Sequence, residues 1–283
     1  MKRIRVVVLT VWLCLALVSC GGAETDALLK IHFLDVGQGD CILLRTPDGD
    51  ILIDAGTEES QEMLCLRLDR LGVEELLLAV FTHTDEDHIG GADGVLSMIP
   101  TREVWVNGSA SDNESAQMLF RTVEKNDIEL RAVCAGEIRR IGDVVLSVFF
   151  PFDSDAASGN ENSIVLKVHC KNFDMVLTGD AGSEQEQMLI EQYGTAQLDC
   201  DIYKVGHHGS NTSSSAAFLS AMTPQYAVIS CGAGNSYGHP MGEVLARLEE
   251  SGAVVLRTDL DGEIVFETNG SELRYRDASL VLQ

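Results

Sequence analysis

The most informative part of this 283-residue chain reads Phe81-Thr82-His83-Thr84-Asp85-Glu86-Asp87-His88-Ile89-Gly90-Gly91. An apolar run from Leu76 to Phe81 leads into it and two glycines end it, which predicts a buried strand, a tight loop and a following helix. Imidazoles and carboxylates crowded into one loop repel each other or compete for protons unless a cation lies among them. They are also the usual ligands of divalent metals. A polar solvent loop is the alternative interpretation, but the strand-loop-helix setting favours a metal site.

Length and composition set the class of protein. With 45% hydrophobic residues, the chain can bury a large core as one domain or as two closely joined halves. It carries 44 acidic and 20 basic residues, a formal net charge of −24. This balance argues against strong non-specific binding to nucleic acid through a basic surface, and it suits a protein that holds cations.

The first residues resemble a bacterial lipoprotein signal. A positively charged start, Met1 to Arg5, precedes an apolar run from Val6 to Val18 that is too short to span a bilayer comfortably. The run ends in Leu17-Val18-Ser19-Cys20-Gly21, which resembles a lipobox with Cys20 as the lipidated residue. An ordinary cleaved signal or a short anchor is the alternative interpretation.

A lipid on Cys20 would divide the chain into a signal peptide at 1–20, a tether at 21–28 and a folded domain at 29–283. It would also make the membrane a partner of the chain. We therefore expect an extracytoplasmic protein that is lipid-anchored to the outer face of the bacterial cell membrane.

Six cysteines follow the signal, and none of them has CxxC or metal-ligand spacing. Disulfides are permitted outside the cell, but most of these residues sit in apolar strand or helix patterns, which favours buried thiols. The pairing stays open. The six are Cys41, Cys65, Cys134, Cys170, Cys200 and Cys231.

The rest of the chain alternates short apolar runs with amphipathic ones. Hairpin strands come first, and strands and helices then alternate in both halves. We expect a helix at Ser115 to Asn126 with a serine N-cap, a helix at Gly182 to Tyr193, and a last strand that ends at Thr268. The pattern predicts two mixed sheets face to face, with helices on both outer sides.

Metal donors recur in loops just after predicted strands, and five of the seven histidines lie in such loops. Strand ends at one edge of a sandwich can converge, and glycines beside the donors allow close backbone approach. Two metals sharing Asp180 would satisfy the donor count, lower the pKa of a bound water and clamp both oxygens of a displacement at phosphorus or carbon. The donors are His83, Asp85, Asp87, His88, Asp180, His207, His208 and His239.

The order of these motifs resembles the metallo-β-lactamase superfamily. Four further stretches resemble, more narrowly, the extracellular metallo-β-lactamase-like domain of the DNA-uptake protein ComEC and its stand-alone relatives, and the likeness runs from Leu29 to Thr268. The four are Leu34-Asp-Val-Gly-Gln-Gly-Asp40, Asn160-Glu-Asn-Ser-Ile-Val165, Gly206-His-His-Gly-Ser210 and Tyr237-Gly-His-Pro240. The resemblance implies an α/β protein with a four-layer αββα sandwich, a metal site at the sheet edge, and phosphodiester hydrolysis with DNA as the favoured substrate.

The resemblance also implies roles for individual residues. His83 and Asp85 would serve the first metal, Asp87 and His88 the second, and Asp180 would bridge them. Whether Asp87 is a ligand or a catalytic proton acceptor stays open.

The later histidines have implied roles as well. His239 matches the last metal histidine of the superfamily. His207 and His208 match a position near the leaving group, as proton donors or additional ligands, and which of the two faces the metal stays open. Substrate contacts would come from Lys204, Ser210 and Asn162.

Two departures from the superfamily pattern affect the metal. Asp85 stands where the second histidine of His-x-His-x-Asp-His is usual, and the mid-chain histidine ligand is missing, with Asn160 or Asn162 in its neighbourhood. The site is therefore richer in oxygen ligands. This favours one or two Mn²⁺ or Mg²⁺ ions over Zn²⁺ and disfavours β-lactam hydrolysis.

The leading hypothesis is a surface-tethered, metal-dependent phosphodiesterase or nuclease that uses a metal-activated water. The alternatives are a hydrolase of a small ester, lactone or thioester on the same site, and a non-catalytic binding protein related to DNA uptake. The acidity favours short or single-stranded DNA, although Arg139, Arg140, Lys167 and Lys204 could guide a phosphate locally. We infer no obligate protein partner.

Overall fold

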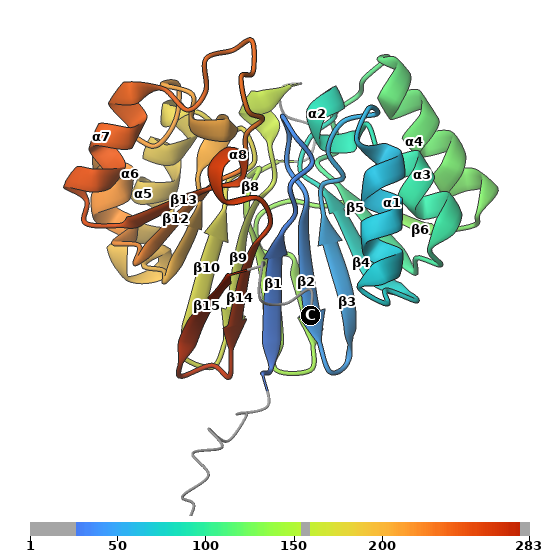
Figure 1. The fold of residues 1–283 in the computed structure, drawn as a ribbon, viewed down its shortest axis with the longest axis horizontal. Helices are drawn as coiled ribbons and strands as arrows, with labels where there is room; N and C mark the ends of the chain where they lie inside the picture. Colours follow the sequence, from blue (N-terminus) through green and yellow to red (C-terminus); the bar gives the residue numbers. More distant parts are fainter. Residues whose placement is uncertain (1–26, 154–158, 278–283) are drawn as a thin grey trace, which may run out of the picture.

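The computed structural model describes residues 27–153 and 159–277. Two mixed β-sheets face each other and helices cover both outer sides, so that four layers follow in the order αββα (Figure 1). The expected fold class is confirmed.

The first sheet is built mainly from the N-terminal half of the chain. Its strands are β1 (Leu29–Phe33), β2 (Ile42–Thr46), β3 (Gly49–Ile53), β4 (Leu76–Phe81), β5 (Glu103–Val106), β6 (Glu129–Ala132), β14 (Ile264–Thr268) and β15 (Leu273–Asp277). They lie in the order β15-β14-β1-β2-β3-β4-β5-β6. The strands from β3 to β6 are parallel, and the remaining pairs are antiparallel.

The second sheet is built from the middle and later parts of the chain. Its strands are β7 (Ile138–Ile141), β8 (Val144–Phe150), β9 (Val165–Cys170), β10 (Phe173–Leu177), β11 (Ile202–Lys204), β12 (Tyr226–Ile229) and β13 (Val254–Arg257). They lie in the order β13-β12-β11-β10-β9-β8-β7, and the strands from β10 to β13 are parallel.

The helices form the outer layers. Those beside the first sheet are α1 (Gln61–Arg70), α2 (Glu86–Ile89), α3 (Ala92–Met98) and α4 (Glu114–Lys125). Those beside the second are α5 (Ser183–Leu198), α6 (Ala216–Met222), α7 (Gly242–Glu250) and the short α8 (Thr258–Asp261). Two 3₁₀ turns complete the fold, η1 (Asn160–Asn162) and η2 (Gly206–Gly209).

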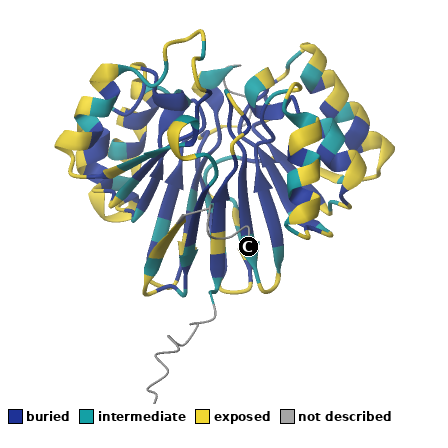
Figure 2. Cartoon of the chain, viewed as in Figure 1, coloured by how far each residue is buried: buried dark blue, intermediate teal, exposed yellow. Residues whose placement is uncertain are grey.

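The core lies in three layers that follow from the alternation of side chains along each strand. In β1, for example, Ile31 and Phe33 point into the space between the two sheets, where they join residues such as Leu166 of β9. The outer faces of the central strands are apolar as well, because helices cover them (Figure 2). Parallel strands buried on both faces explain the continuous apolar runs that mark β4 and β12 in the sequence.

Some element boundaries differ from those expected. Helix α4 begins two residues early, because Asn113 and not Ser115 caps it, with the Asn113 side chain accepting from the backbone N–H of Ala116 (2.7 Å). Helix α5 runs past Tyr193 to Leu198, although Gly194 interrupts its helical backbone. Strands β7 and β15 were not anticipated, because exposed arginines break their apolar pattern, as is common in edge strands.

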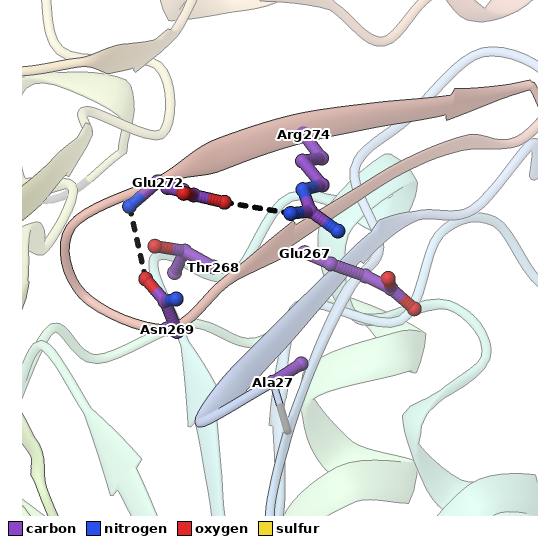
Figure 3. Close-up of a pocket in the computed structure, with 6 residues that line it drawn as sticks. All are labelled: Ala27, Glu267, Thr268, Asn269, Glu272 and Arg274. Carbon is purple, nitrogen blue, oxygen red and sulfur yellow. Dashed lines mark hydrogen bonds and ion pairs between the residues drawn. The ribbon is translucent and has the colours of Figure 1, made fainter. Parts of the chain in front are cut away.

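The topology gathers the metal donors at one edge. The carboxyl ends of β3 and β4 in one sheet, and of β10, β11 and β12 in the other, open on the same edge of the sandwich, at the top of Figure 1. The turn between β14 and β15 lies at the opposite end. There Asn269 accepts from the backbone N–H of Glu272, and Glu272 pairs with Arg274 (Figure 3).

Cys41, Cys170, Cys200 and Cys231 are buried free thiols, as expected, and Cys65 and Cys134 are partly buried and also free. The proposed lipid site at Cys20 lies outside the described residues. Within residues 27–153 and 159–277, none of the helices has the length and apolar character needed to cross a membrane.

Candidate metal centre

The loop after β4 supplies the first donors. Its backbone turns directly into α2, because the carbonyl of Asp85 accepts from the N–H groups of His88 and Ile89. His83 and His88 are fully buried, and their rings lie 4.1 Å apart, centroid to centroid. The side chain of Asp85 stays about half exposed. The loop therefore presents buried imidazoles below and a carboxylate at the surface.

Asp180 lies at the centre of the cluster, in the loop after β10. Its Oδ1 is 3.1 Å from His88 Nε2 and 3.7 Å from His208 Nε2, and its Oδ2 is 3.8 Å from His83 Nε2 and 3.4 Å from His207 Nε2. One buried carboxylate thus faces four imidazoles.

The loop after β10 comes this close because of Gly179. The residue adopts φ +50°, and a Cβ there would lie 3.0–3.1 Å from the side chains of Thr82 and Ser163. Ser163 in turn accepts from the backbone N–H of Asp180 (3.1 Å). A larger residue at 179 would push the Asp180 carboxylate away from the β4 loop.

The turn η2 presents two histidines from strained backbone. His207 and His208 both have positive φ, 50° and 52°, a conformation that non-glycine residues adopt rarely and mostly at functional sites. The carbonyl of Ser230 can only accept, so His208 must donate to it from Nδ1 (3.0 Å). His208 Nε2 then faces Asp87 Oδ2 at 3.2 Å and His88 Nε2 at 3.3 Å.

Two carboxylates lie on the Nδ1 side of the central imidazoles, those of His88 and His208. Asp54 Oδ2 accepts from His88 Nδ1 at 2.8 Å, and Thr82 holds Asp54 through both its backbone N–H and its hydroxyl. Asp40 Oδ1 lies 3.2 Å from His208 Nδ1. Such carboxylate–histidine pairs fix the ring orientation and the tautomer of metal-binding histidines.

The donor set fits divalent cations. Because His88 and His208 donate from Nδ1, the Nε2 atom of each neutral ring carries a lone pair and no hydrogen. The two lone pairs therefore face each other without a hydrogen between them. His83 Nε2 and Asp180 Oδ1 are buried without a hydrogen-bond partner. Buried polar atoms are rarely left unpaired, and a cation among these atoms resolves each of them. His83, His88 and Asp180 lie close enough to hold an ion together. Asp40 also lies near His88 and His208, but it is paired with Lys204.

The comparison with known families agrees with this geometry. The family model described as "Metallo-beta-lactamase superfamily" matches residues 34–233, more than half of the chain. The chain belongs to the metallo-β-lactamase superfamily. Membership implies a metal-dependent hydrolase whose fold binds divalent metals.

Two curated proteins are similar in sequence to most of this chain. "ComE operon protein 3" of Bacillus subtilis (strain 168) is 29% identical, and the match covers 91% of this chain and 35% of that protein. "Competence protein ComA" of Neisseria gonorrhoeae is 34% identical, with 86% and 32% covered. The chain therefore spans about a third of the length of the curated relatives it matches.

Solved structures share the metallo-β-lactamase fold. CmlA, a diiron beta-hydroxylase from Streptomyces venezuelae, superposes with a TM-score of 0.56 at 12% identity, covering 86% of this chain and 55% of that chain. At this identity the likeness shows the fold alone.

The residues expected to act as metal donors lie close together. His83 and His88 lie at the buried base, and a cavity of about 240 Å³ opens above them at the sheet edge. The cavity is lined by Gln38, Asp85, Asp87, Asn160, Asp180, His207, His208, Tyr237 and His239. All eight residues expected to act as metal donors therefore lie in or directly beneath one cavity.

The structure places the three expected substrate-binding residues elsewhere. Lys204 is fully buried, and its Nζ pairs with Asp40 Oδ2 (2.8 Å) and donates to the carbonyl of Val205. Asn162 is buried behind the site, where its amide donates to Ser109. Ser210 is buried too, and its hydroxyl accepts from Thr212. None of the three lines the cavity.

Asn160 takes the place expected for Asn162. Its amide Nδ2 lies 3.4 Å from Asp180 Oδ2 and 3.3 Å from His207 Nε2, within the cavity. The 3₁₀ turn η1 rotates about 120° per residue, so Asn160 and Asn162 point in different directions, which the Asn-Glu-Asn sequence could not reveal. The suggested basic patch does not form at the site either, because Arg139 pairs with Glu103 and Lys167 with Asp174.

Two residues that contact the buried histidines are not among the site residues expected from the sequence. Asp40 follows Gly39 in the Leu34 to Asp40 motif, and Asp54 comes directly after strand β3, two residues before Gly56. The position of Asp54 indicates either a residue that orients a site or a cap of the next element. Only the three-dimensional pairing shows which histidine each carboxylate serves.

Burial and neighbouring charges set the protonation of the cluster. Burial and the adjacent His88 lower the pKa of His83 to about 3. Burial also acts against a charged His208, but Asp180 and Asp40 outweigh it and raise that pKa to about 9. In the same way, Asp180 and Asp54 raise the pKa of His88 well above its usual range. Without metal, the neighbouring carboxylates therefore favour the protonated forms of His88 and His208.

Metal binding should consequently release protons. A cation on Nε2 needs a neutral ring, so affinity should rise with pH from 6 towards the pKa of His208, about 9. Isothermal titration calorimetry of Mn²⁺ binding, in buffers of differing ionisation enthalpy at one pH, measures the released protons. Binding heats that do not depend on the buffer, together with a pH-independent affinity, would contradict the assignment of these rings as ligands.

Asp54→Asn tests the role of the carboxylate behind His88. Losing this charge should lower metal affinity or activity about 10–100-fold, the usual cost of losing such a partner. Asp50→Asn is a matched control, since Asp50 lies on the same strand β3 but pairs with Arg45. Equal effects of the two substitutions on metal affinity would show that Asp54 acts only through stability.

Proposed function

We propose that this chain is a metal-dependent phosphodiesterase that cleaves DNA. The observation that supports it most is the carboxylate of Asp180 facing four imidazoles at the base of an open cavity. A divalent ion held by such donors would act as a Lewis acid on a phosphoryl oxygen and lower the pKa of a water. A relative named as a competence protein agrees with a DNA substrate.

We assign the ligand roles from position and burial. His83, His88, His208 and Asp180 are the buried donors, and the more exposed Asp85 and Asp87 would complete the set at the cavity. Three carboxylates and three imidazoles line the cavity. Asp85 stands where the superfamily usually has a histidine, and this additional oxygen ligand favours Mn²⁺ or Mg²⁺ over Zn²⁺.

We assign substrate roles to two further residues. The His207 side chain is partly exposed, and its Nδ1 is fixed by Thr212 (3.0 Å), so its Nε2 can deliver a proton to the leaving oxygen. The Asn160 amide can donate to a phosphoryl oxygen from the same side of the cavity. His239 lines the rim, and its buried Nδ1 has no hydrogen-bond partner, so the ring can serve as a further ligand.

The cavity offers no basic side chain to a phosphate. Asp85, Asp87 and Asp180 line it, and no Lys or Arg does among the described residues. A divalent ion held by these carboxylates would therefore be the positive group that attracts the phosphodiester. A short or single-stranded DNA meets less repulsion from a chain of net charge −24 than a duplex does.

The test is a substrate panel on metal-stripped protein reloaded with Mn²⁺, Mg²⁺ or Zn²⁺. We expect cleavage of single-stranded DNA, slower cleavage of duplex DNA, and little hydrolysis of esters, lactones or thioesters. If the protein hydrolyses an ester or lactone and does not cleave DNA, the phosphodiesterase proposal is wrong and the chain is a hydrolase of small esters or lactones.

We further propose that the domain acts outside the cytoplasm, tethered through a lipid on Cys20. The supporting observation is the lipobox-like stretch Leu17 to Gly21. Metabolic labelling with radioactive palmitate should mark the wild type and leave Cys20→Ala unlabelled. Equal labelling of both proteins, or of neither, would contradict the tether.

A further inference from the structure

The cavity has an aromatic rim that the proposed chemistry does not use. Tyr237 lies in the loop between β12 and α7 and lines the cavity together with the metal donors. Its side chain is 63% exposed. Among the described residues, no other strongly exposed large hydrophobic side chain lines this cavity.

The ring of Tyr237 belongs to a stack that leads out from the metal site. It lies nearly parallel to the His239 ring, with 5.7 Å between centroids and 22° between planes. His239 in turn meets His207 edge-on, with centroids 5.8 Å apart. One side of the tyrosine is therefore supported by a residue of the site, and most of the ring is open to solvent.

The loop that carries Tyr237 is fixed at both ends. At its start, the N–H of Gly232 donates to Gln38 Oε1 (3.1 Å). At its end, the N–H of Met241 donates to the carbonyl of Gly209 (2.9 Å), and Pro240 packs so closely on Gly209 that a Cβ there would lie 2.5 Å from the proline Cβ.

The interior of the loop is also braced. The Asn235 side chain donates to the carbonyl oxygens of Gly232 (2.9 Å) and His239 (2.6 Å), and it accepts from the N–H of His239 (3.0 Å). A platform held in this way loses little conformational entropy when a ligand stacks on it.

Basic side chains cannot provide the remaining affinity for a phosphodiester, because none lines the cavity among the described residues. The chemical groups available at the rim are an aromatic face and the amides of Gln38 and Asn160. An aromatic face binds every nucleobase by stacking, without the need for positive charge. A paired base in a duplex is already stacked on both sides and cannot reach the tyrosine without being unpaired.

We propose that Tyr237 stacks on the nucleobase next to the scissile phosphate, so that the site selects unpaired nucleotides. This inference rests on the proposed phosphodiesterase function and names its substrate class. Tyr237 is a specificity-determining residue here, and it takes no part in the bond-breaking step.

The test compares two labelled single-stranded oligonucleotides of the same length, one with all its bases and one with tetrahydrofuran abasic units. Tyr237→Ala should raise the KM for the base-bearing strand about 5- to 150-fold, the range that corresponds to the loss of one stacked base. It should leave the KM for the abasic strand as in the wild type. Tyr237→Phe, which keeps the ring, should retain the preference for the base-bearing strand. Tyr275→Ala removes an exposed tyrosine far from the cavity and is the matched control.

Equal effects of Tyr237→Ala on the two strands, or no effect on either, would overturn the inference. Binding of the same labelled strands by fluorescence anisotropy separates it from the proposed function. If the wild type cleaves neither strand but Tyr237→Ala weakens binding of the base-bearing strand, the phosphodiesterase proposal is wrong and the stacking platform stands. If Tyr237→Ala leaves binding of the base-bearing strand unchanged, the stacking proposal is wrong, whether or not cleavage occurs.

Discussion

Asp180→Ala is expected to lower kcat/KM for phosphodiester cleavage by about 10²–10³-fold or more, the scale on which a lost electrostatic contact acts in catalysis. The carboxylate lies within 3.8 Å of Nε2 in four histidines, so its loss affects every proposed metal position at once. Metal binding should weaken in parallel, because the buried His83 and His88 then face each other without a negative charge between them.

Asp174→Ala is the control for this substitution. Asp174 lies near the other end of β10 and pairs with Lys167 and His169, away from the cavity. Circular dichroism should show both variants folded, with activity and bound metal reduced only in Asp180→Ala. Activity within a few-fold of wild type in a folded Asp180→Ala protein would mean that the cluster around Asp180 is not the catalytic site.

Lys204→Met is expected to destabilise the protein by about 3–5 kcal/mol, the usual cost of removing one partner of a buried ion pair. Lys204 and Asp40 are each about 1% exposed, and the ammonium lies 2.8 Å from Asp40 Oδ2. Without the lysine, His208 is the nearest charged neighbour of Asp40, at 3.2 Å. Urea unfolding of the metal-free proteins measures the difference in free energy.

The pH dependence of that difference identifies its cause. Burial would raise the pKa of Asp40, but Lys204 and His208 outweigh it and hold this pKa well below its usual range. The pair therefore stabilises the wild type above the ordinary carboxyl pKa of about 4, and this contribution is lost as the pH falls below it. In Lys204→Met, the buried Asp40 carboxylate lowers the free energy of unfolding while it is charged. Its protonation in acid removes this cost.

The difference in free energy of unfolding between the wild type and Lys204→Met should accordingly be largest at neutral pH and become smaller in acid. The double variant Lys204→Met/Asp40→Asn, which removes both charges, should regain much of the stability. A difference that stays constant with pH, or a double variant less stable than Lys204→Met, would show that lost packing of the lysine stem is the cause.

The metal cluster could be predicted because its donors follow strands. In an α/β sandwich, the carboxyl ends of β4, β10 and β11 meet at one edge, so the loops that start at His83, Asp180 and His207 had to converge there. The apolar runs that end in these loops are visible in the sequence. The order of strands within each sheet was not needed for this conclusion.

The substrate contacts could not be predicted, because they depend on which way single side chains point. Asn160 and Asn162 are two residues apart in one short turn, yet one lines the cavity and the other is buried. Lys204 ends a strand three residues before His207, but its ammonium turns inward to Asp40, a partner 164 positions away in the chain. The stacking of Tyr237 on His239 depends on a loop whose bracing by Asn235 appears only in three dimensions.

The central claim is that this donor cluster binds a divalent metal and uses it to hydrolyse phosphodiesters. The most direct test titrates metal-stripped protein with Mn²⁺ and measures bound metal and hydrolysis of bis-p-nitrophenyl phosphate on the same samples. Activity that rises in step with occupancy, and that is absent from Asp180→Ala at every Mn²⁺ concentration, is the expected result. Full metal occupancy without hydrolysis, or hydrolysis that does not follow occupancy, would contradict the claim.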